Sequence, residues 1–223
     1  MNYANYIWIN LILIIFSYFI GSINISILIS KIIYKKDIRN FGSKNAGATN
    51  IFREYGKNVA LLVFIFDLLK SYLTIMLVYL IQKQLYLQPY VENIISISCG
   101  IGVILGHLFP IYFKFKGGKG VSCFLGLTLA VNFILFLVAI SLFLLIIIAT
   151  KYVSLASIIV PFIISLFSLI PWMSDGILGF TNTQNIFWLP AIILFISYFF
   201  VLISHRKNIS RLLNKSENKI LQK

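Results

Sequence analysis

The sequence predicts an all-α integral membrane protein with about seven transmembrane helices. Of its 223 residues, 60% are hydrophobic and only 11% are charged, a composition too apolar for a soluble domain. Long apolar runs alternate with short basic loops, and no change in composition marks a second domain. We therefore expect residues 1–223 to form a single polytopic membrane domain, in contact with the lipid bilayer over most of its surface.

The first two apolar runs are long enough to cross a bilayer, which takes ~20 residues. The first covers about residues 6–34 and includes small and polar residues near its middle, which favour close helix packing over ligand contact: Gly21, Ser22, Asn24 and Ser26. The second covers residues 59–82 and carries Asp67 and Lys70, three positions apart on one helical face. We expect them to pair, although charges inside a span are often functional as well.

The apolar stretch over residues 121–150 is too long for one straight helix. At ~1.5 Å per residue such a helix would measure about 45 Å, against a hydrocarbon core of ~30 Å. Two short helices turning near Asn132 fit better. The other runs cover residues 94–113, 152–172 and 186–204, with polar links at 83–93 and 174–185.

The distribution of Lys and Arg predicts the orientation, because short cytoplasmic loops carry the excess of positive charge. Residues 35–57 contain six Lys and Arg, residues 114–119 contain three, and the tail over residues 205–223 contains six. The links at 83–93 and 174–185 share a single one, Lys83. We therefore expect the N-terminus outside, and the basic loops and the basic tail in the cytoplasm. The net charge of +13 then faces lipid headgroups or an anionic substrate, and no nucleic acid partner is expected.

Polar clusters gather on this predicted cytoplasmic side. They are the loops Gly42–Arg53 and Lys114–Gly120, and the segments Lys151–Ser157 and Ser204–Asn208. Glycine lets backbone N–H groups approach an anion, while Ser, Thr, Asn and Arg supply further donors. A single basic residue at a membrane surface indicates only contact with headgroups. Four such clusters together predict an anion pocket with room for more than one phosphate.

The motifs in these clusters resemble a known family. They read G-S-x-N-x-G-A-T-N-x-x-R from Gly42, G-H-x-F-P-x-x-x-x-F-K-G-G-K-G from Gly106, K-Y-V-S-L-A-S from Lys151 and H-R-x-N-I-x-R-L from His205. In this order they are similar to the bacterial acyl-phosphate:glycerol-3-phosphate acyltransferases of the PlsY type, over about residues 21–213. The resemblance implies an enzyme of seven helices in the cytoplasmic (inner) membrane, with its active site facing the cytoplasm.

The resemblance also implies the reaction. An acyl group would pass from acyl phosphate to the 1-hydroxyl of glycerol 3-phosphate, giving 1-acylglycerol 3-phosphate (lysophosphatidic acid) and phosphate for phospholipid biosynthesis. The acyl phosphate would be supplied by a partner phosphate acyltransferase that uses acyl carrier protein. No cofactor and no metal are expected.

Carried over residue by residue, the resemblance implies a catalytic core of six side chains: Ser43, Arg53, Lys119, Ser157, His205 and Asn208. Lys119 and Arg53 would hold phosphate charge, the two serines would bind phosphoryl oxygens, and His205 and Asn208 would orient glycerol 3-phosphate. Further substrate contacts are expected, partly through backbone N–H groups, from Gly42, Asn45, Gly47, Thr49, Asn50, Gly117, Gly118, Gly120 and Ser154.

The sequence lacks the H-x4-D pair of many acyl-CoA-dependent acyltransferases. The residues five positions after His107 and His205 are Tyr112 and Ser210, and no Ser-His-Asp set is evident. We therefore favour a mechanism in which a substrate phosphate accepts the hydroxyl proton while the protein positions and stabilises charge.

Two positions depart from the family pattern. Lys44 stands where glycine is common, so a positive φ there would strain the loop, and Lys207 stands where an acid is frequent. The alternative function is a membrane transporter or lipid-handling protein for a phosphate-bearing metabolite. Against it, the sequence shows no internal repeat, and the polar clusters lie on one face of the membrane.

Overall fold

All regular structure in the described part of the chain is helical. The computed structural model describes residues 3–85, 94–175, 178–180 and 186–220, and its only pairing of extended backbone there is an isolated bridge between Asn132 and Gly179. The predicted links at 83–93 and 174–185 lie largely outside the described residues. The all-α prediction is confirmed.

Several helices are long and apolar enough to cross a membrane. Among the described residues these are the stretches Ile7–Ile32, Lys57–Gln84 (α4), Ser96–Phe113 and Phe133–Thr150 (α7). Helix α10 (Leu189–Ser204) and helix α11 (Arg206–Leu213) meet at 63° and make a fifth if they count as one bent span, while α6 (Val121–Val131) and α8 (Val153–Phe167) are shorter apolar helices. This arrangement is that of a multi-pass membrane protein.

The first apolar run is broken into two helices, α1 (Tyr3–Gly21) and α2 (Ile25–Ile32). Asn24 causes the restart, because its side-chain oxygen accepts a hydrogen bond from the backbone N–H of Ile27 at 3.1 Å and caps α2. Gly21 shows the predicted close packing, since a Cβ at this position would collide with the backbone of Val103 on α5 (Cys99–Leu108).

The predicted helical hairpin is confirmed, with its turn at Asn132 between α6 and α7. The Asn132 side chain accepts hydrogen bonds from the backbone N–H groups of Ile134 and Leu135, at 2.7 and 3.2 Å, and caps α7. The expectation of two short helices is right only for α6, which has 11 residues, because α7 has 18 and reaches spanning length.

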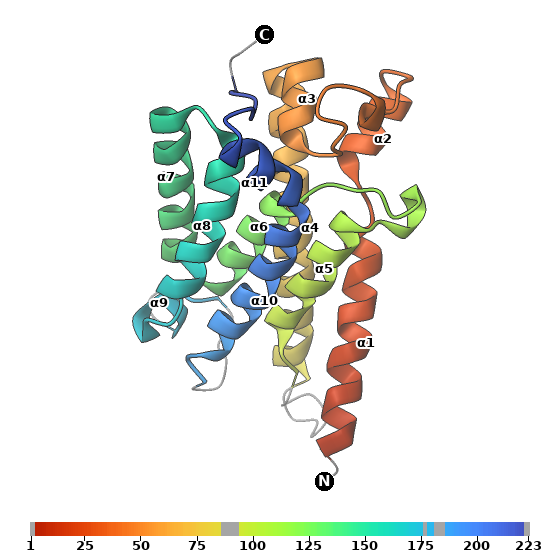
Figure 1. Cartoon of the computed structure of the whole chain (residues 1–223). Coiled ribbons are helices and arrows are strands. Elements are labelled where there is room, and N and C mark those ends of the chain that lie inside the picture. The colour runs from red at the N-terminus through yellow and green to blue at the C-terminus, as the bar shows by residue number, and fades with distance from the viewer. Residues whose placement is uncertain (1–2, 86–93, 176–177, 181–185, 221–223) are drawn as a thin grey trace.

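The helices form a bundle in which α1 packs on α5, α4 on α6, α7 on α8 and α8 on α10 (Figure 1). Its core is apolar and includes Ile104, Phe124 and Leu194, whereas residues such as Trp8 and Ile148 point outward. The remaining short helices are η1 (Ile38–Asn40), α3 (Ala48–Tyr55), η2 (Ser96–Ser98), η3 (Ile111–Phe113) and α9 (Pro171–Asp175).

One end of the bundle is built differently from the other. Helices α2, α3 and α11 gather at the end away from the start of α1 (Figure 1). Part of the predicted basic tail is helical there: α11 begins directly after His205 and lies at 63° to α10. The residues after α11 return toward it, since Glu217 contacts Asn208 and Arg211. This end holds the polar clusters found in the sequence.

Candidate active site

A polar pocket of about 150 Å³ opens at this end of the bundle. All six predicted core residues line it: Ser43, Arg53, Lys119, Ser157, His205 and Asn208. Of the predicted substrate contacts, Asn45, Gly47, Thr49, Gly120 and Ser154 line it as well. Four segments that lie far apart in the sequence therefore converge on one cavity.

Asn50 and Gly42 do not line the pocket, and both hold the loop itself. Asn50 is buried; its side-chain oxygen accepts from the Ser43 N–H at 2.9 Å, and its amide nitrogen donates to the carbonyls of Ile38 and Phe41. The N–H of Lys44 is also used, by the carbonyl of Phe41 at 2.9 Å. The predicted backbone cradle over residues 42–45 is therefore partly wrong, because two of its donors are consumed within the loop.

Gly117 and Gly118 also lie outside the pocket lining. Their N–H groups donate to the carbonyls of Leu108 and His107, at 3.1 and 3.0 Å, and so pair with the C-terminal end of α5. A Cβ at either glycine would collide with His107. These glycines serve close packing of the loop against α5, and the prediction that their N–H groups bind phosphate is corrected.

The backbone donors of the pocket come instead from helix ends. The N-terminal turns of α3, α6 and α8 line it, through Gly47, Gly120, Val153 and their neighbours. None of these three helix starts is capped by a side chain. The first N–H groups of a helix have no partner within the helix and carry a partial positive charge, so three such ends around one cavity are suited to binding an anion.

A chain of polar contacts crosses the pocket mouth. The Lys119 ammonium donates to the side-chain oxygen of Asn208, whose amide nitrogen donates to Glu217 Oε1 at 2.8 Å. Glu217 Oε2 accepts from Arg211 Nε at 2.9 Å, and the carboxylate side chain is only 6% exposed. Sequence reasoning missed Glu217 and Arg211; the signal was a lone acid in an otherwise basic tail.

The segment that follows α11, residues 218–220, contacts the walls of the same site. Arg53 donates to the carbonyl of Asn218 at 3.5 Å, and the N–H of Ile220 donates to the carbonyl of Lys151 at 3.0 Å. The Lys219 ammonium lies 5.9 Å from the centre of the Tyr152 ring, within the range of a cation–π contact. The segment after α11 therefore forms one wall of the pocket.

Burial lowers the pKa of two bases in the pocket lining, Lys119 and His205. The pKa of Lys119 is lowered to about 8, mainly by burial and also by Arg211 and Arg53, with Glu217 opposing the change. The pKa of His205 is lowered to about 4 by burial and by the charge of Lys119. His205 is thus neutral at pH 7, and its Nδ1, 2.8 Å from the Val201 carbonyl, holds the proton. Its Nε2 remains as a hydrogen-bond acceptor.

The two serines of α8 differ in what they offer. Ser157 Oγ donates to the carbonyl of Val153 at 2.9 Å, which leaves its lone pairs toward the pocket. Ser154 Oγ is buried and has no hydrogen-bond partner within the described structure. An unsatisfied buried hydroxyl in a pocket wall is suited to binding a polar ligand atom.

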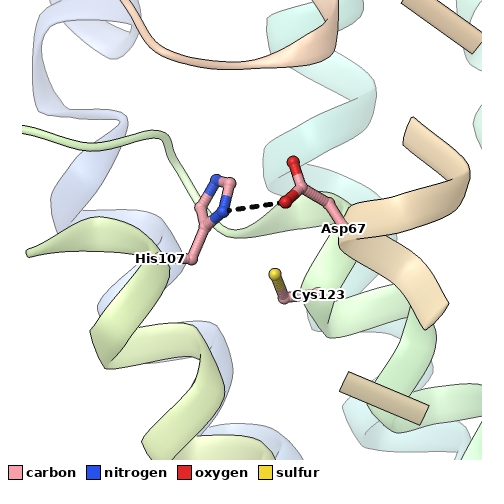
Figure 2. A group of neighbouring side chains, drawn as sticks. All are labelled: Asp67, His107 and Cys123. Carbon is pink, nitrogen blue, oxygen red and sulfur yellow. Dashed lines mark ion pairs between the residues drawn. The ribbon is translucent and has the colours of Figure 1, made fainter. Parts of the chain in front are cut away.

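Below the polar walls lies a buried charged group (Figure 2). The predicted pair of Asp67 and Lys70 is confirmed, with 2.7 Å between Oδ1 and Nζ, and His107 Nδ1 lies 3.4 Å from the same carboxylate oxygen. Cys123 lies beside them, so that its sulfur, the carboxylate and the imidazole are within 4.8 Å of one another. Asp67 and His107 line the pocket and Cys123 does not.

This group has the composition of a metal site or of a Cys-His-Asp set, neither of which the sequence order suggested. The Lys70 ammonium, however, contacts both Asp67 and His107 Nδ1, the latter at 3.1 Å, and so takes the place of a metal cation. Cys123 is fully buried outside the pocket lining and cannot reach a substrate there. Lys70 also binds the carbonyls of Gly21 and Ile23, which ties the group to the break between α1 and α2.

Comparison with protein families gives one match over most of the chain. A family model described as glycerol-3-phosphate acyltransferase matches residues 11–215. A glycerol-3-phosphate acyltransferase of Mycoplasmopsis agalactiae is 43% identical, covering 98% of this chain and 97% of the relative. One of Mycoplasmopsis synoviae is 40% identical, covering 95% of both chains.

Two solved structures show the same arrangement of helices. Both are crystal structures of PlsY (YgiH), described as an integral membrane glycerol 3-phosphate acyltransferase. The glycerol 3-phosphate form has a TM-score of 0.76 at 33% identity, and the lysophosphatidic acid form has 0.74 at 32%. Each comparison covers 94% of both chains.

Proposed function

Because this chain belongs to the glycerol-3-phosphate acyltransferase family, and so acylates glycerol 3-phosphate for phospholipid synthesis, we propose that its acyl donor is acyl phosphate. One observation carries the proposal most: three uncapped helix N-termini, Lys119 and Arg53 surround a single small pocket. Both substrates would bring a phosphate group to it, and phosphate is also the leaving group. The enzyme then needs no nucleophile of its own.

We propose the following roles for the lining residues. Lys119 and Arg53 bind phosphate charge, and Ser43 and Ser154 donate hydrogen bonds to phosphoryl oxygens. Ser157 does the same once its hydroxyl turns from the Val153 carbonyl to the bound phosphate. Neutral His205 accepts a hydrogen bond from a glycerol hydroxyl through Nε2, and Asn208 orients the same substrate. Asn45, Thr49, and the helix starts at Gly47 and Gly120 complete the phosphate site.

In the proposed reaction the 1-hydroxyl oxygen attacks the acyl carbonyl carbon. A new C–O ester bond forms, the bond between that carbon and the phosphate oxygen breaks, and inorganic phosphate leaves. The hydroxyl proton passes to a substrate phosphate oxygen. The carboxylates in the described lining, Asp67 and Glu217, are held by Lys70 and Arg211, and the low pKa of His205, about 4, makes it a weak base. The protein contributes alignment of the two substrates and stabilisation of the developing negative charge.

We further propose that residues 1–223 form one domain with seven spans. The N-terminus would lie outside, and α3, α11 and the pocket would face the cytoplasm at the cytoplasmic (inner) membrane. The clustering of Lys and Arg in the loops at the pocket end supports this orientation. A phosphate acyltransferase would deliver acyl phosphate from that side.

The decisive experiment compares acyl donors. The purified protein in detergent is incubated with glycerol 3-phosphate and either acyl phosphate or acyl-CoA, and released phosphate and lysophosphatidic acid are measured. We expect turnover with acyl phosphate alone. Comparable turnover with acyl-CoA would refute the donor proposal, and uptake of glycerol phosphate by proteoliposomes without any product would favour a transporter.

The same assay tests the site. Lys119→Ala and Ser43→Ala should each abolish turnover while the helical content and elution volume stay unchanged. Lys83→Ala, a matched change at a lysine outside the pocket lining, should retain wild-type rates. Near-wild-type turnover in both pocket variants would contradict the assigned site.

A further inference from the structure

A second cavity lies behind the walls of the active site and has a strongly cationic lining. Its volume is about 520 Å³, and among its lining residues are five cations and one acid: Arg39, Lys44, Lys114, Lys116, Lys207 and Asp37. The volume falls in the range of ~300–1,000 Å³ that is typical of small-ligand sites. Neither the family assignment nor the reaction gives this cavity a role.

The only acid in the lining is already neutralised. Arg39 forms two contacts with the Asp37 carboxylate, at 2.7 and 2.9 Å, and Lys31 adds a third at 3.4 Å. Arg39 also donates to the carbonyls of Phe113 and Lys116, so this guanidinium is committed to joining the two loops. The positive charge left over belongs to the lysines.

The four lysines Lys44, Lys114, Lys116 and Lys207 have no ion-pair partner within the described residues. Two of them, Lys44 and Lys114, are held with φ of +59° and +58°. A side chain in this left-handed region costs ~1–2 kcal/mol, and such strain is most often retained where it serves a site. All four lysines are exposed, and their unpaired ammonium groups around one cavity attract an anion to it.

The surroundings of the cavity indicate a lipid instead of a free ion. Tyr112 and Phe115, which flank Lys114 in the sequence, are each 57% exposed, and Phe41 beside the first loop is also exposed. Exposed aromatic rings next to lysines are typical of the layer where lipid headgroups meet the hydrocarbon core. An anionic headgroup in the cavity would place its acyl chains along these rings.

We propose that this cavity binds the phosphate headgroup of an anionic membrane lipid. The site is separate from the active site but shares its walls, because neighbouring residues face opposite ways. Ser43 and Asn45 line the active-site pocket, while Lys44 lines the second cavity. In the same way, Asn208 lines the active-site pocket and Lys207 lines the second cavity. A bound headgroup therefore rests on the back of the catalytic loops.

The test measures lipid binding to delipidated protein in detergent by native mass spectrometry and by titration, using short-chain phosphatidylglycerol, short-chain phosphatidylcholine and inorganic phosphate as probes. We expect saturable binding of phosphatidylglycerol. Lys44→Gln/Lys207→Gln should weaken it about tenfold or more, because each juxtamembrane lysine contributes substantially to headgroup binding. If Lys44→Gln/Lys207→Gln folds poorly, Lys114→Gln/Lys116→Gln removes two other lysines of the same cavity and should weaken lipid binding equally.

The matched control is Lys35→Gln/Lys57→Gln, which removes two exposed lysines from the same end of the protein but outside the cavity. It should change the affinity less than about twofold, since distant exposed charges are screened. Lys119→Met should leave phosphatidylglycerol binding intact, which would show that the measured lipid does not bind in the active-site pocket.

Three results would each overturn the proposal. They are equal weakening by the control pair, equally tight binding of phosphatidylcholine, and displacement of the lipid by inorganic phosphate at the lipid's own concentration. The last would make the cavity a site for free phosphate. Because the readout is binding, failure of the donor assay leaves this test unaffected.

Discussion

Lys119 combines an enclosed position with a charge that the proposed chemistry uses. Its pKa of about 8 is set chiefly by burial, and a bound phosphate would favour the charged form. We predict that kcat/KM falls as the pH rises through about 8, because the free enzyme then loses the ammonium. A rate profile from pH 6 to 10 checks this, and a flat profile across pH 8 would contradict it.

The same side chain should weaken the fold when no substrate is bound. Its pKa is lowered from 10.5 in the unfolded chain to about 8, so the unfolded state binds the proton more tightly, and this cost to stability disappears as the pH rises from about 8 to 10.5. We predict that Lys119→Met unfolds at a higher temperature at pH 7 while turnover falls at least about 100-fold. Lys57→Met is the exposed control. A lower unfolding temperature for Lys119→Met would show that the buried ammonium stabilises the fold, contrary to this prediction.

Lys44 has a backbone conformation that favours glycine. The sequence predicts strain if this position needs a positive φ, and the structure confirms a φ of +59°. Lys44→Gly should therefore raise stability by about 1 kcal/mol, or about 2–4 °C in unfolding temperature for a chain of this size. Scanning calorimetry measures it, with Lys207→Gly expected to lower stability because that residue lies within α11.

Among the elements, α4 and α5 are joined by charges buried inside the bundle. Asp67→Asn would leave the Lys70 ammonium, which is 11% exposed, without its carboxylate partner. Removing one member of a buried pair typically costs ~3–5 kcal/mol. We predict severe thermal destabilisation of Asp67→Asn and partial recovery in Asp67→Asn/Lys70→Met. If Asp67→Asn alone were as thermally stable as the wild type, the pair of Asp67 and Lys70 would contribute little to the stability of the fold.

Element positions followed well from the sequence where one physical rule decided them. The hairpin at Asn132 followed from the length of the apolar stretch, and the pairing of Asp67 with Lys70 followed from helical spacing. The break between α1 and α2 was not predicted, because Asn24 acts as a helix cap only when the chain turns there, and the surrounding apolar run hides that choice.

The site was predicted more completely in its side chains than in its backbone. All six core side chains line one pocket, yet the N–H groups of Ser43, Lys44, Gly117 and Gly118 are bound within the protein. Motif spacing cannot tell a glycine that frees an N–H from one that allows close packing. The part played by Glu217 depends on the folding back of the chain after α11, which has no local sequence signal.

At the scale of the whole molecule, the orientation in the membrane is open to a direct test. In a chain with Cys99 and Cys123 replaced by Ala, we expect Lys83→Cys to react with an impermeant maleimide on intact cells. Lys215→Cys should react only after the membrane is permeabilised, because the proposed orientation places the Lys- and Arg-rich end in the cytoplasm. The reverse labelling pattern would invert the proposed topology.

The contact between Arg53 and Asn218 joins residues that lie 165 positions apart. During synthesis Arg53 leaves the ribosome 165 residues before Asn218 does. The pocket wall that Asn218 contributes can therefore form only after α10 and α11 have been synthesised, so the site is assembled late from a loop that was made early.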